Sequence, residues 1–165
     1  MVVIKTSLGD IELELFEKEA PGTVANFLEY VDAGHYNKTI FHRVIDNFMI
    51  QGGGLDVSFE EKATGKPIAN EASNRISNKC GAIAMARTNQ VHSATAQFFI
   101  NIKDNNFLDF QNETPQGFGY CVFGKVTKGM DVVDKIKSVE THTVGYHDDV
   151  PVENVVINEI CRKET

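Results

Sequence analysis

The segment FHRVIDNFMIQGG, residues 41–53, is the stretch from which this chain is best interpreted. It reads as a strand, a short polar turn and a returning strand, because two apolar runs flank a pair of turn-forming residues. Side chains alternate along a strand, so Arg43 and Ile45 are expected on one face, with His42 and Val44 on the other. An arginine inside an apolar strand needs a partner. One hypothesis is that Arg43 pairs with a carboxylate at the rim of a barrel.

A second hypothesis makes Arg43 part of a site. The turn would bring back Phe48, Met49 and Gln51, which are an aromatic ring, a thioether and an amide. These residue types could form an apolar pocket that is bordered by one fixed cation. The residues 41–53 alone leave both hypotheses open.

The rest of the chain reads as many short strands with two helices. A hairpin is predicted over residues 2–15, where Ile11 to Leu15 alternate strictly between apolar and acidic residues. A helix should begin at Pro21 and end at Gly34, and a second one should cover residues 130–137. Further strand-like runs cover residues 39–45, 48–51, 82–86, 97–102, 120–126 and 155–161. This pattern predicts a mainly β fold, a closed or nearly closed antiparallel barrel with helices over its ends. Residues 55–80, 103–118 and 139–150 are interpreted as loops.

Composition limits the class of protein. The 165 residues fit a single domain, residues 1–165. Sixteen Lys and Arg against 23 Asp and Glu give a net charge of −7, which argues against general binding of nucleic acid or of an anionic membrane surface. Cys80, Cys121 and Cys161 lie far apart, which predicts free thiols rather than a disulfide framework or a zinc site. With no signal-peptide pattern at the start, a cytoplasmic location is expected.

Four further blocks carry a resemblance. They are GAIAMAR at 81–87, SATAQFFIN at 93–101, NFLD at 106–109 and GYCVFGKV at 119–126. Together with residues 41–53, they resemble the signature blocks of the cyclophilin peptidyl-prolyl isomerases. The match spans almost the whole chain in the right order and is most similar to the short bacterial cytoplasmic branch.

This resemblance implies a fold, an activity and a site. The fold would be a closed antiparallel eight-stranded β-barrel capped by two α-helices. The activity would be cis/trans isomerisation of Xaa-Pro bonds in proline-containing polypeptides, by a monomer without metal or cofactor. Arg43 would be the catalytic residue, and Gln51 would hold its guanidinium in place. The substrate-binding residues would be Phe48, Met49, Ala86, Arg87, Gln97, Phe99, Phe107, Leu108 and Tyr120.

The chemistry of prolyl rotation explains why an arginine is suited to this task. Amide resonance creates a barrier of about 18–20 kcal/mol. Twisting the bond returns a lone pair to the proline nitrogen, and a fixed cation can donate a hydrogen bond to it. That bond is absent from the planar ground state, so it raises the rate. A proline-peptide binding module or holdase would share the apolar pocket but would have no need of Arg43 or Gln51.

Three positions differ from the best-known eukaryotic cyclophilins. Phe107 stands where they often carry Trp, Tyr120 where they carry His, and Arg87 where they carry Asn. The resemblance therefore implies that activity is retained and that ligand preference changes, so that cyclosporin-like cyclic peptides should bind weakly. A Ser-His-Asp hydrolase built on Ser93, His92 and Asp104 is not favoured, because no nucleophile elbow surrounds the serine.

Overall fold

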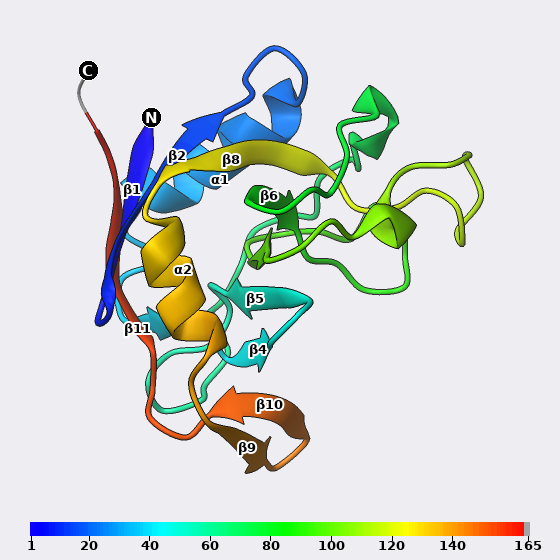
Figure 1. Ribbon diagram of the computed structural model, residues 1–165. Helices are drawn as coiled ribbons and strands as arrows, with labels where there is room; N and C mark the ends of the chain where they lie inside the picture. The colour runs from blue at the N-terminus through cyan, green and yellow to red at the C-terminus, as the bar shows by residue number, and fades with distance from the viewer. Residues whose placement is uncertain (164–165) are drawn as a thin grey trace.

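The computed structural model describes residues 1–163, which form a curled antiparallel sheet with two α-helices and a separate hairpin (Figure 1). The strands are β1 (Val2–Thr6), β2 (Gly9–Leu15), β3 (Thr39–Ile40), β4 (Arg43–Ile45), β5 (Met49–Gly52), β6 (Ala82–Met85), β7 (Phe98–Asn101), β8 (Val122–Lys128), β9 (Thr141–Val144), β10 (His147–Pro151) and β11 (Val156–Arg162). The helices are α1 (Pro21–Asp32) and α2 (Met130–Lys137), with short 3-10 turns η1 (Ala72–Asn74) and η2 (Asn106–Leu108).

The main sheet has nine strands in the order β3-β11-β1-β2-β8-β6-β7-β5-β4. The predicted mainly β, antiparallel fold with two helices is confirmed, but the closed eight-stranded detail is wrong. Within residues 1–163, no ladder joins the two edge strands β3 and β4. The physical reason is local: Phe41 and His42, which connect these strands, form no turn, and the Phe41 N–H donates to the Val155 carbonyl at 3.0 Å, so the chain does not fold back to pair β3 with β4. The single strand predicted over residues 39–45 is divided at the same point.

Residues 139–150 were interpreted as a loop, and this interpretation is also wrong. They contain β9 and most of β10, a two-stranded hairpin that packs against β4. The hairpin projects from the body beside β4 and β5 (Figure 1). Most side chains of β9 and the start of β10 are exposed, so this segment lacks the apolar alternation by which the other strands were recognised.

Alternation along the strands divides the sheet into two apolar faces. On β7, Phe98 belongs to the main core, whereas Phe99 belongs to a second cluster on the opposite face. The rings of Phe27, Phe98 and Phe123 pack together in the main core, with Phe27 centroids 5.9 Å and 5.1 Å from the other two. The second cluster is unusual, because the outer face of an antiparallel sheet is commonly polar.

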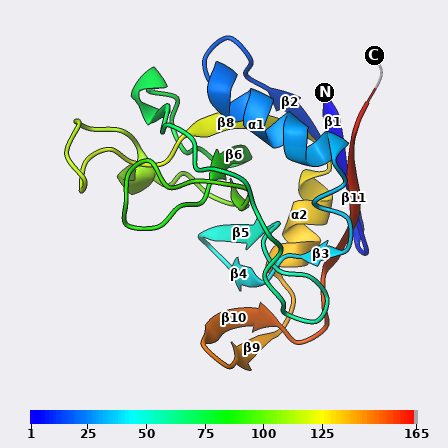
Figure 2. The ribbon, with the colours of Figure 1, turned by 180° about the vertical axis from the view of Figure 1, so that it is seen from behind.

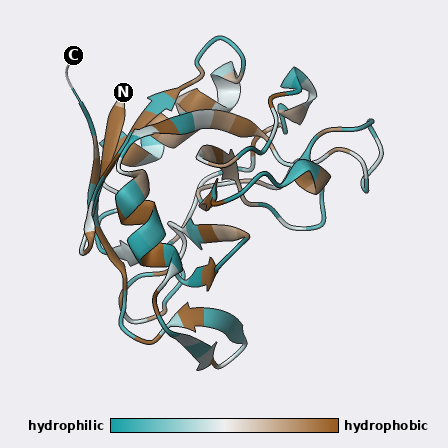
Figure 3. Ribbon diagram, viewed as in Figure 1, coloured by the Kyte–Doolittle hydropathy of each residue, from teal (hydrophilic) through white to brown (hydrophobic). Residues whose placement is uncertain are grey.

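The two helices cover different parts of the curled sheet. Helix α2 contacts β2, β4 and β5, and so bridges strands that are distant in the sheet order. In Figure 3 the helix carries both hydrophilic residues (teal) and hydrophobic residues (brown). The hydrophobic residues Val132, Val133 and Ile136 are buried. Helix α1 contacts β11 and, seen from behind in Figure 2, lies in front of β8 and β2.

Helix α1 receives its N-terminal cap from a distant residue. Ala20 occupies the N-cap position and cannot accept a hydrogen bond from the first turn through its side chain. Instead, the Glu71 carboxylate accepts from the backbone N–H groups of Gly22 at 3.3 Å and Thr23 at 2.7 Å, and from the Thr23 hydroxyl at 2.7 Å. The contact links the irregular segment after β5 to the helix.

None of the helices within residues 1–163 combines the length and the apolar character that a membrane crossing requires.

Candidate active site

The site lies on the outer apolar cluster of the sheet. Its buried members come from four neighbouring strands: Met49 on β5, Ala82 and Ala84 on β6, Phe99 on β7 and Val122 on β8. Because consecutive side chains on a strand point to opposite faces, each strand also contributes a residue to the main core behind the cluster. The cluster is therefore held on a rigid support.

A cavity of about 150 Å³ opens over this cluster. Such a volume fits a small ring rather than a drug-sized ligand. The lining residues are Arg43, Phe48, Met49, Gln51, Ala86, Arg87, Phe99, Leu108 and Tyr120. All of them belong to the residues named from the sequence. The structure thus brings together segments that are up to about eighty positions apart along the chain.

Arg43 lies at the edge of this cavity, directly opposite Gln51 in the β4–β5 ladder. Its Nη1 donates to Oε1 of Gln51 at 3.4 Å, and its guanidinium carbon is 6.0 Å from the Phe48 ring centroid. Within residues 1–163, no carboxylate forms an ion pair with Arg43. The hypothesis of a carboxylate-paired arginine at a barrel rim is therefore not supported by this geometry.

The two predicted residues outside the cavity lining lie next to it. Gln97 accepts a hydrogen bond through Oε1 from Nε2 of Gln51 at 3.0 Å, so the Arg43–Gln51 contact continues one residue further. Phe107 stacks on Phe48 with ring centroids 5.7 Å apart and is 66% exposed. Phe107 thus supports the wall from outside, with one face open to solvent.

Arg87 contributes its side chain as well as its backbone to the site. Its Nε and Nη2 donate to the Gly119 carbonyl at 3.1 Å and 3.0 Å, and its guanidinium carbon is 4.5 Å from the Tyr120 ring centroid. The Tyr120 ring in turn meets the edge of Phe99, with centroids 5.7 Å apart. From the sequence, only the backbone of Arg87 was expected to matter. The structure shows that its side chain orients the Tyr120 wall.

His42, the neighbour of Arg43, points to the other side of the strand and is buried. Burial is the main cause that lowers its pKa to about 4, and the nearby His147 and Arg43 contribute. The imidazole is consequently neutral near pH 7. A neutral ring does not compete with Arg43 as a second cation beside the cavity.

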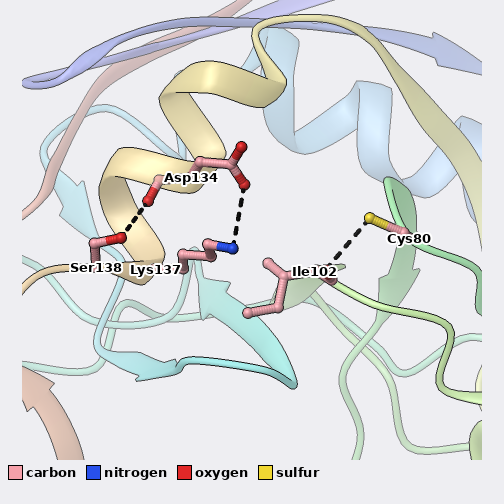
Figure 4. Close-up of polar contacts among 5 residues, drawn as sticks. All are labelled: Cys80, Ile102, Asp134, Lys137 and Ser138. Atoms are coloured by element: carbon pink, nitrogen blue, oxygen red, sulfur yellow. Dashed lines mark hydrogen bonds and ion pairs between the residues drawn. The ribbon is translucent and has the colours of Figure 1, made fainter.

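The thiols of Cys80 and Cys121 are not activated as nucleophiles. Burial raises the pKa of the Cys121 thiol to about 11 and also raises that of Cys80, beside which Asp104 and Asp134 add negative charge. Figure 4 shows Cys80 donating to the Ile102 carbonyl at 3.3 Å, near the Lys137–Asp134 ion pair at the end of α2. Residues 1–163 hold no group of three or more metal-ligating side chains.

The hydrolase triad that the sequence did not favour is not assembled either. The Ser93 hydroxyl donates to the Gln90 carbonyl at 2.6 Å, and Nδ1 of His92 accepts from the backbone N–H of Asn70 at 2.9 Å. Each group is engaged in holding a loop, and neither is hydrogen-bonded to the other.

Sequence reasoning missed the polar residues beneath the cavity. Asn78, Asn101 and Asn105 are fully buried behind its walls. The available signal was an asparagine that ends the apolar run FFIN at residue 101, where an interior strand position would normally be apolar.

The geometry agrees with comparisons to known proteins. The family model described as cyclophilin type peptidyl-prolyl cis-trans isomerase/CLD matches residues 1–162. The chain belongs to the cyclophilin family. Its function is that of a peptidyl-prolyl cis/trans isomerase, as the resemblance implied.

Similar proteins include bacterial isomerases and more distant structures. This cyclophilin is 56% identical to peptidyl-prolyl cis-trans isomerase B of Escherichia coli, over 99% of this chain and 100% of the relative. It is 59% identical to a peptidyl-prolyl cis-trans isomerase of Streptomyces antibioticus, over 94% of both chains. A crystal structure of a Cryptosporidium parvum cyclophilin, determined in the presence of the dipeptide Ala-Pro, has a TM-score of 0.79 at 25% identity and 99% coverage of both chains.

Proposed function

We propose that the cavity beside Arg43 is where this cyclophilin rotates the prolyl bond. The proline ring would enter the apolar space between Phe48, Met49, Phe99 and Leu108. The segments carrying Ala86 and Arg87 would hold the flanking substrate chain. Such a site needs no cofactor, because the reaction only twists a bond.

The observation that carries the proposal is the environment of the Arg43 guanidinium. Its guanidinium borders an apolar cavity, is tethered by one amide oxygen, and has no carboxylate partner within residues 1–163. A carboxylate would neutralise the positive charge, whereas the Gln51 amide orients it and leaves other N–H groups free to donate. These groups would meet the lone pair that appears on the proline nitrogen when the bond is twisted. A binding module would gain nothing from such an arrangement.

The direct test is NMR exchange spectroscopy on a short Ala-Pro peptide with the parent protein and with Arg43→Ala. Loss of one charge-assisted hydrogen bond, worth about 1.5–3 kcal/mol, should lower kcat roughly ten- to a hundredfold. Peptide binding should be largely retained, because the lone pair exists only in the transition state.

Arg162→Ala is the matched control. It also removes one arginine charge, but Arg162 pairs with Asp32 at the junction of β11 and α1, away from the cavity. It should keep the parent rate. An unchanged rate in folded Arg43→Ala would exclude the proposed role of Arg43.

A further inference from the structure

We propose that three buried asparagines, Asn78, Asn101 and Asn105, form a hydrogen-bonded relay that positions the opposing walls of the proline cavity. The inference rests on the proposed function, because it assumes that substrate enters the cavity beside Arg43. The three residues do not line that cavity, and they would act only by fixing the backbone behind it. They are therefore positioning residues and not catalytic ones.

Asn105 holds the first wall. Its Nδ2 donates to the Phe48 carbonyl at 2.8 Å, and that carbonyl also accepts from the backbone N–H of Ile102 at 3.1 Å. Phe48 itself follows the β4–β5 turn and belongs to no strand. The segment after β7 thus holds its carbonyl through two contacts, while its own N–H donates to the Ile45 carbonyl at 3.1 Å across the turn.

Asn101 occupies the centre of the relay. Its Oδ1 accepts from Nδ2 of Asn105 at 2.8 Å, and its own Nδ2 donates to Oδ1 of Asn78 and to the Ala82 carbonyl, both at 3.1 Å. In the β5–β7 ladder, Asn101 stands opposite Met49, which is a floor residue of the cavity. Asn101 thus joins the two ends of the relay directly beneath the site.

Asn78 holds the second wall. Its Nδ2 has three acceptors within reach, which are the Leu108 carbonyl at 3.2 Å, the Tyr120 carbonyl at 3.3 Å and Oδ1 of Asp109 at 3.2 Å, and its two hydrogens are shared among them. Its backbone N–H donates to the Asp109 carboxylate at 2.6 Å, and the other oxygen of that carboxylate accepts from the Ser77 hydroxyl at 2.6 Å. The relay therefore ends on a fixed negative charge, which strengthens a chain of oriented amides.

The burial of these amides indicates a specific role. All three side chains are 0% exposed, and an amide is costly to bury unless it is hydrogen-bonded. Of their amide atoms, only Oδ1 of Asn105 has no hydrogen-bond partner within residues 1–163. Apolar side chains would fill the same space at lower cost, but they could not bind the carbonyls of Phe48, Leu108 and Tyr120. The side chains of Phe48, Leu108 and Tyr120 line the cavity. The relay thus adds a second connection between these walls, beside the ladders that join β5, β7, β6 and β8.

The consequence for catalysis is positional. A reacting group must be held close to its productive geometry, and a small displacement of supporting residues lowers the rate. If the relay is broken, the Phe48 wall can move relative to Leu108 and Tyr120. The proline ring would then be held loosely in both isomers, so peptide binding should weaken together with the rate.

The test is a double-mutant cycle. Asn105→Ala releases the Phe48 side, Asn78→Ala releases the Leu108 side, and the double variant releases both. Each single variant should raise the Kd for the Ala-Pro peptide and lower kcat/KM by about tenfold, measured by NMR well below its unfolding temperature. Because a relay fails as a unit, the two losses should not add. The kcat/KM of the double variant should be close to that of the less active single variant rather than a hundredfold below that of the parent.

Two reference proteins distinguish the possible outcomes. Thr6→Val removes side-chain hydrogen bonds to Gly9 and Leu8 in the distant β1–β2 turn, and it should lower stability without changing Kd. Arg43→Ala should lower kcat and retain peptide binding. If the asparagine variants keep the parent Kd and kcat/KM while Arg43→Ala has a lowered kcat, the relay proposal is overturned and the proposed function stands. Unchanged kinetics in Arg43→Ala as well would overturn the proposed function.

A measurement on the parent protein makes the test independent of variant folding. In ¹⁵N-labelled protein, the side-chain amide resonances of Asn78, Asn101 and Asn105 should shift on titration with the Ala-Pro peptide. The amide of Asn154, which donates to the Val57 carbonyl at 3.4 Å, serves as the control and should remain in place. Relay resonances that stay fixed at saturating peptide would contradict the proposal.

Discussion

At the scale of single residues, the site depends on where alternation places each side chain. Arg43 and Gln51 share the outer face of β4 and β5, whereas Val44 and Ile50 point into the main core. A one-residue shift in either strand would bury the arginine and expose its apolar neighbours. The same alternation sends His42 away from the cavity.

Phe107 provides a prediction about cyclosporin. Its exposed ring stacks on Phe48 and has no hydrogen-bond donor. Phe107→Trp would add an indole N–H that can bind a carbonyl of the cyclic peptide. An unpaired buried carbonyl costs about 1–3 kcal/mol, so inhibition by cyclosporin should strengthen roughly ten- to a hundredfold.

The experiment compares inhibition constants for parent and variant, assayed on one Xaa-Pro peptide. The uninhibited rate is the internal control and should change little, because a prolyl substrate needs only the apolar face. If the inhibition constant is the same in both proteins, Phe107 does not limit cyclosporin binding.

His42 provides a prediction about pH. Its pKa is lowered from 6.5 to about 4 in the folded protein, mainly by burial. Between these values the unfolded chain binds a proton that the folded protein does not, so stability falls as the pH falls from 6.5 towards 4. The contribution of this one group amounts to at most about 3 kcal/mol.

Urea unfolding of the parent and of His42→Phe at pH 7 and pH 4.5 measures this contribution. The parent should lose more free energy of unfolding than the variant over this interval. The isomerase rate of both proteins should be nearly constant between about pH 6 and 8, because a neutral imidazole has no role in the reaction and the guanidinium of arginine keeps its charge. Equal losses of stability would show that His42 titrates normally.

At the scale of elements, one strand serves two purposes. Phe98 and Phe99 on β7 point to opposite faces, so the same four residues fill the core and form the cavity floor. Changes on the inner face are therefore expected to disturb the site. The helices α1 and α2, by contrast, contribute no residue to the cavity lining, whereas the 3-10 turn η2 contributes Leu108.

The cap on α1 provides a prediction at this scale. Glu71→Ala leaves the first-turn N–H groups of Gly22 and Thr23 without their carboxylate acceptor. Loss of a helix cap typically costs about 0.5–2 kcal/mol. Glu71→Gln retains one oxygen acceptor and should lose less. Thermal and urea unfolding should therefore rank the parent above Glu71→Gln, and Glu71→Ala lowest.

Glu113→Ala is the matched control, since it removes an exposed glutamate charge from the loop before Gly117. Its stability should remain within about 0.5 kcal/mol of the parent. A Glu71→Ala protein as stable as Glu113→Ala would mean that solvent can replace the cap.

At the scale of the whole molecule, the two ends of the chain share one sheet. Strand β1 pairs with β2 on one side and with β11 on the other. The strands at the two edges of the sheet, β3 and β4, are separated by only two residues along the chain. We propose on this basis that residues 1–163, the part of the predicted domain 1–165 that the structure describes, form one cooperative domain.

Cooperative unfolding follows from this arrangement. Far-UV circular dichroism and NMR signals from the cavity residues should give coincident urea transitions, as a two-state domain requires. Strands from the two halves of the sequence are interleaved in the main sheet, where β11 lies between β3 and β1, β2 pairs with β8, and β7 pairs with β5, so neither half should persist alone. Two separated transitions would contradict the single-domain proposal.

The amino-acid sequence determined those features that depend on local periodicity. Helix α2 was predicted with the bounds the structure shows, and the strand-like runs lie within a few residues of β5 to β8. The face of Arg43 and the identity of every residue lining the cavity were also available, because alternation and recognisable blocks are properties of short segments.

Tertiary structure alone decided which distant groups meet. It left the sheet open between β3 and β4, placed Glu71 on the N-terminus of a helix 48 residues earlier, and joined three asparagines beneath the cavity. A carboxylate such as that of Glu71, or a buried amide, takes whichever donor or acceptor the packed fold brings within hydrogen-bond distance. Periodicity reports the face on which a side chain lies, whereas its partner is set by the packing of segments that are remote in the chain.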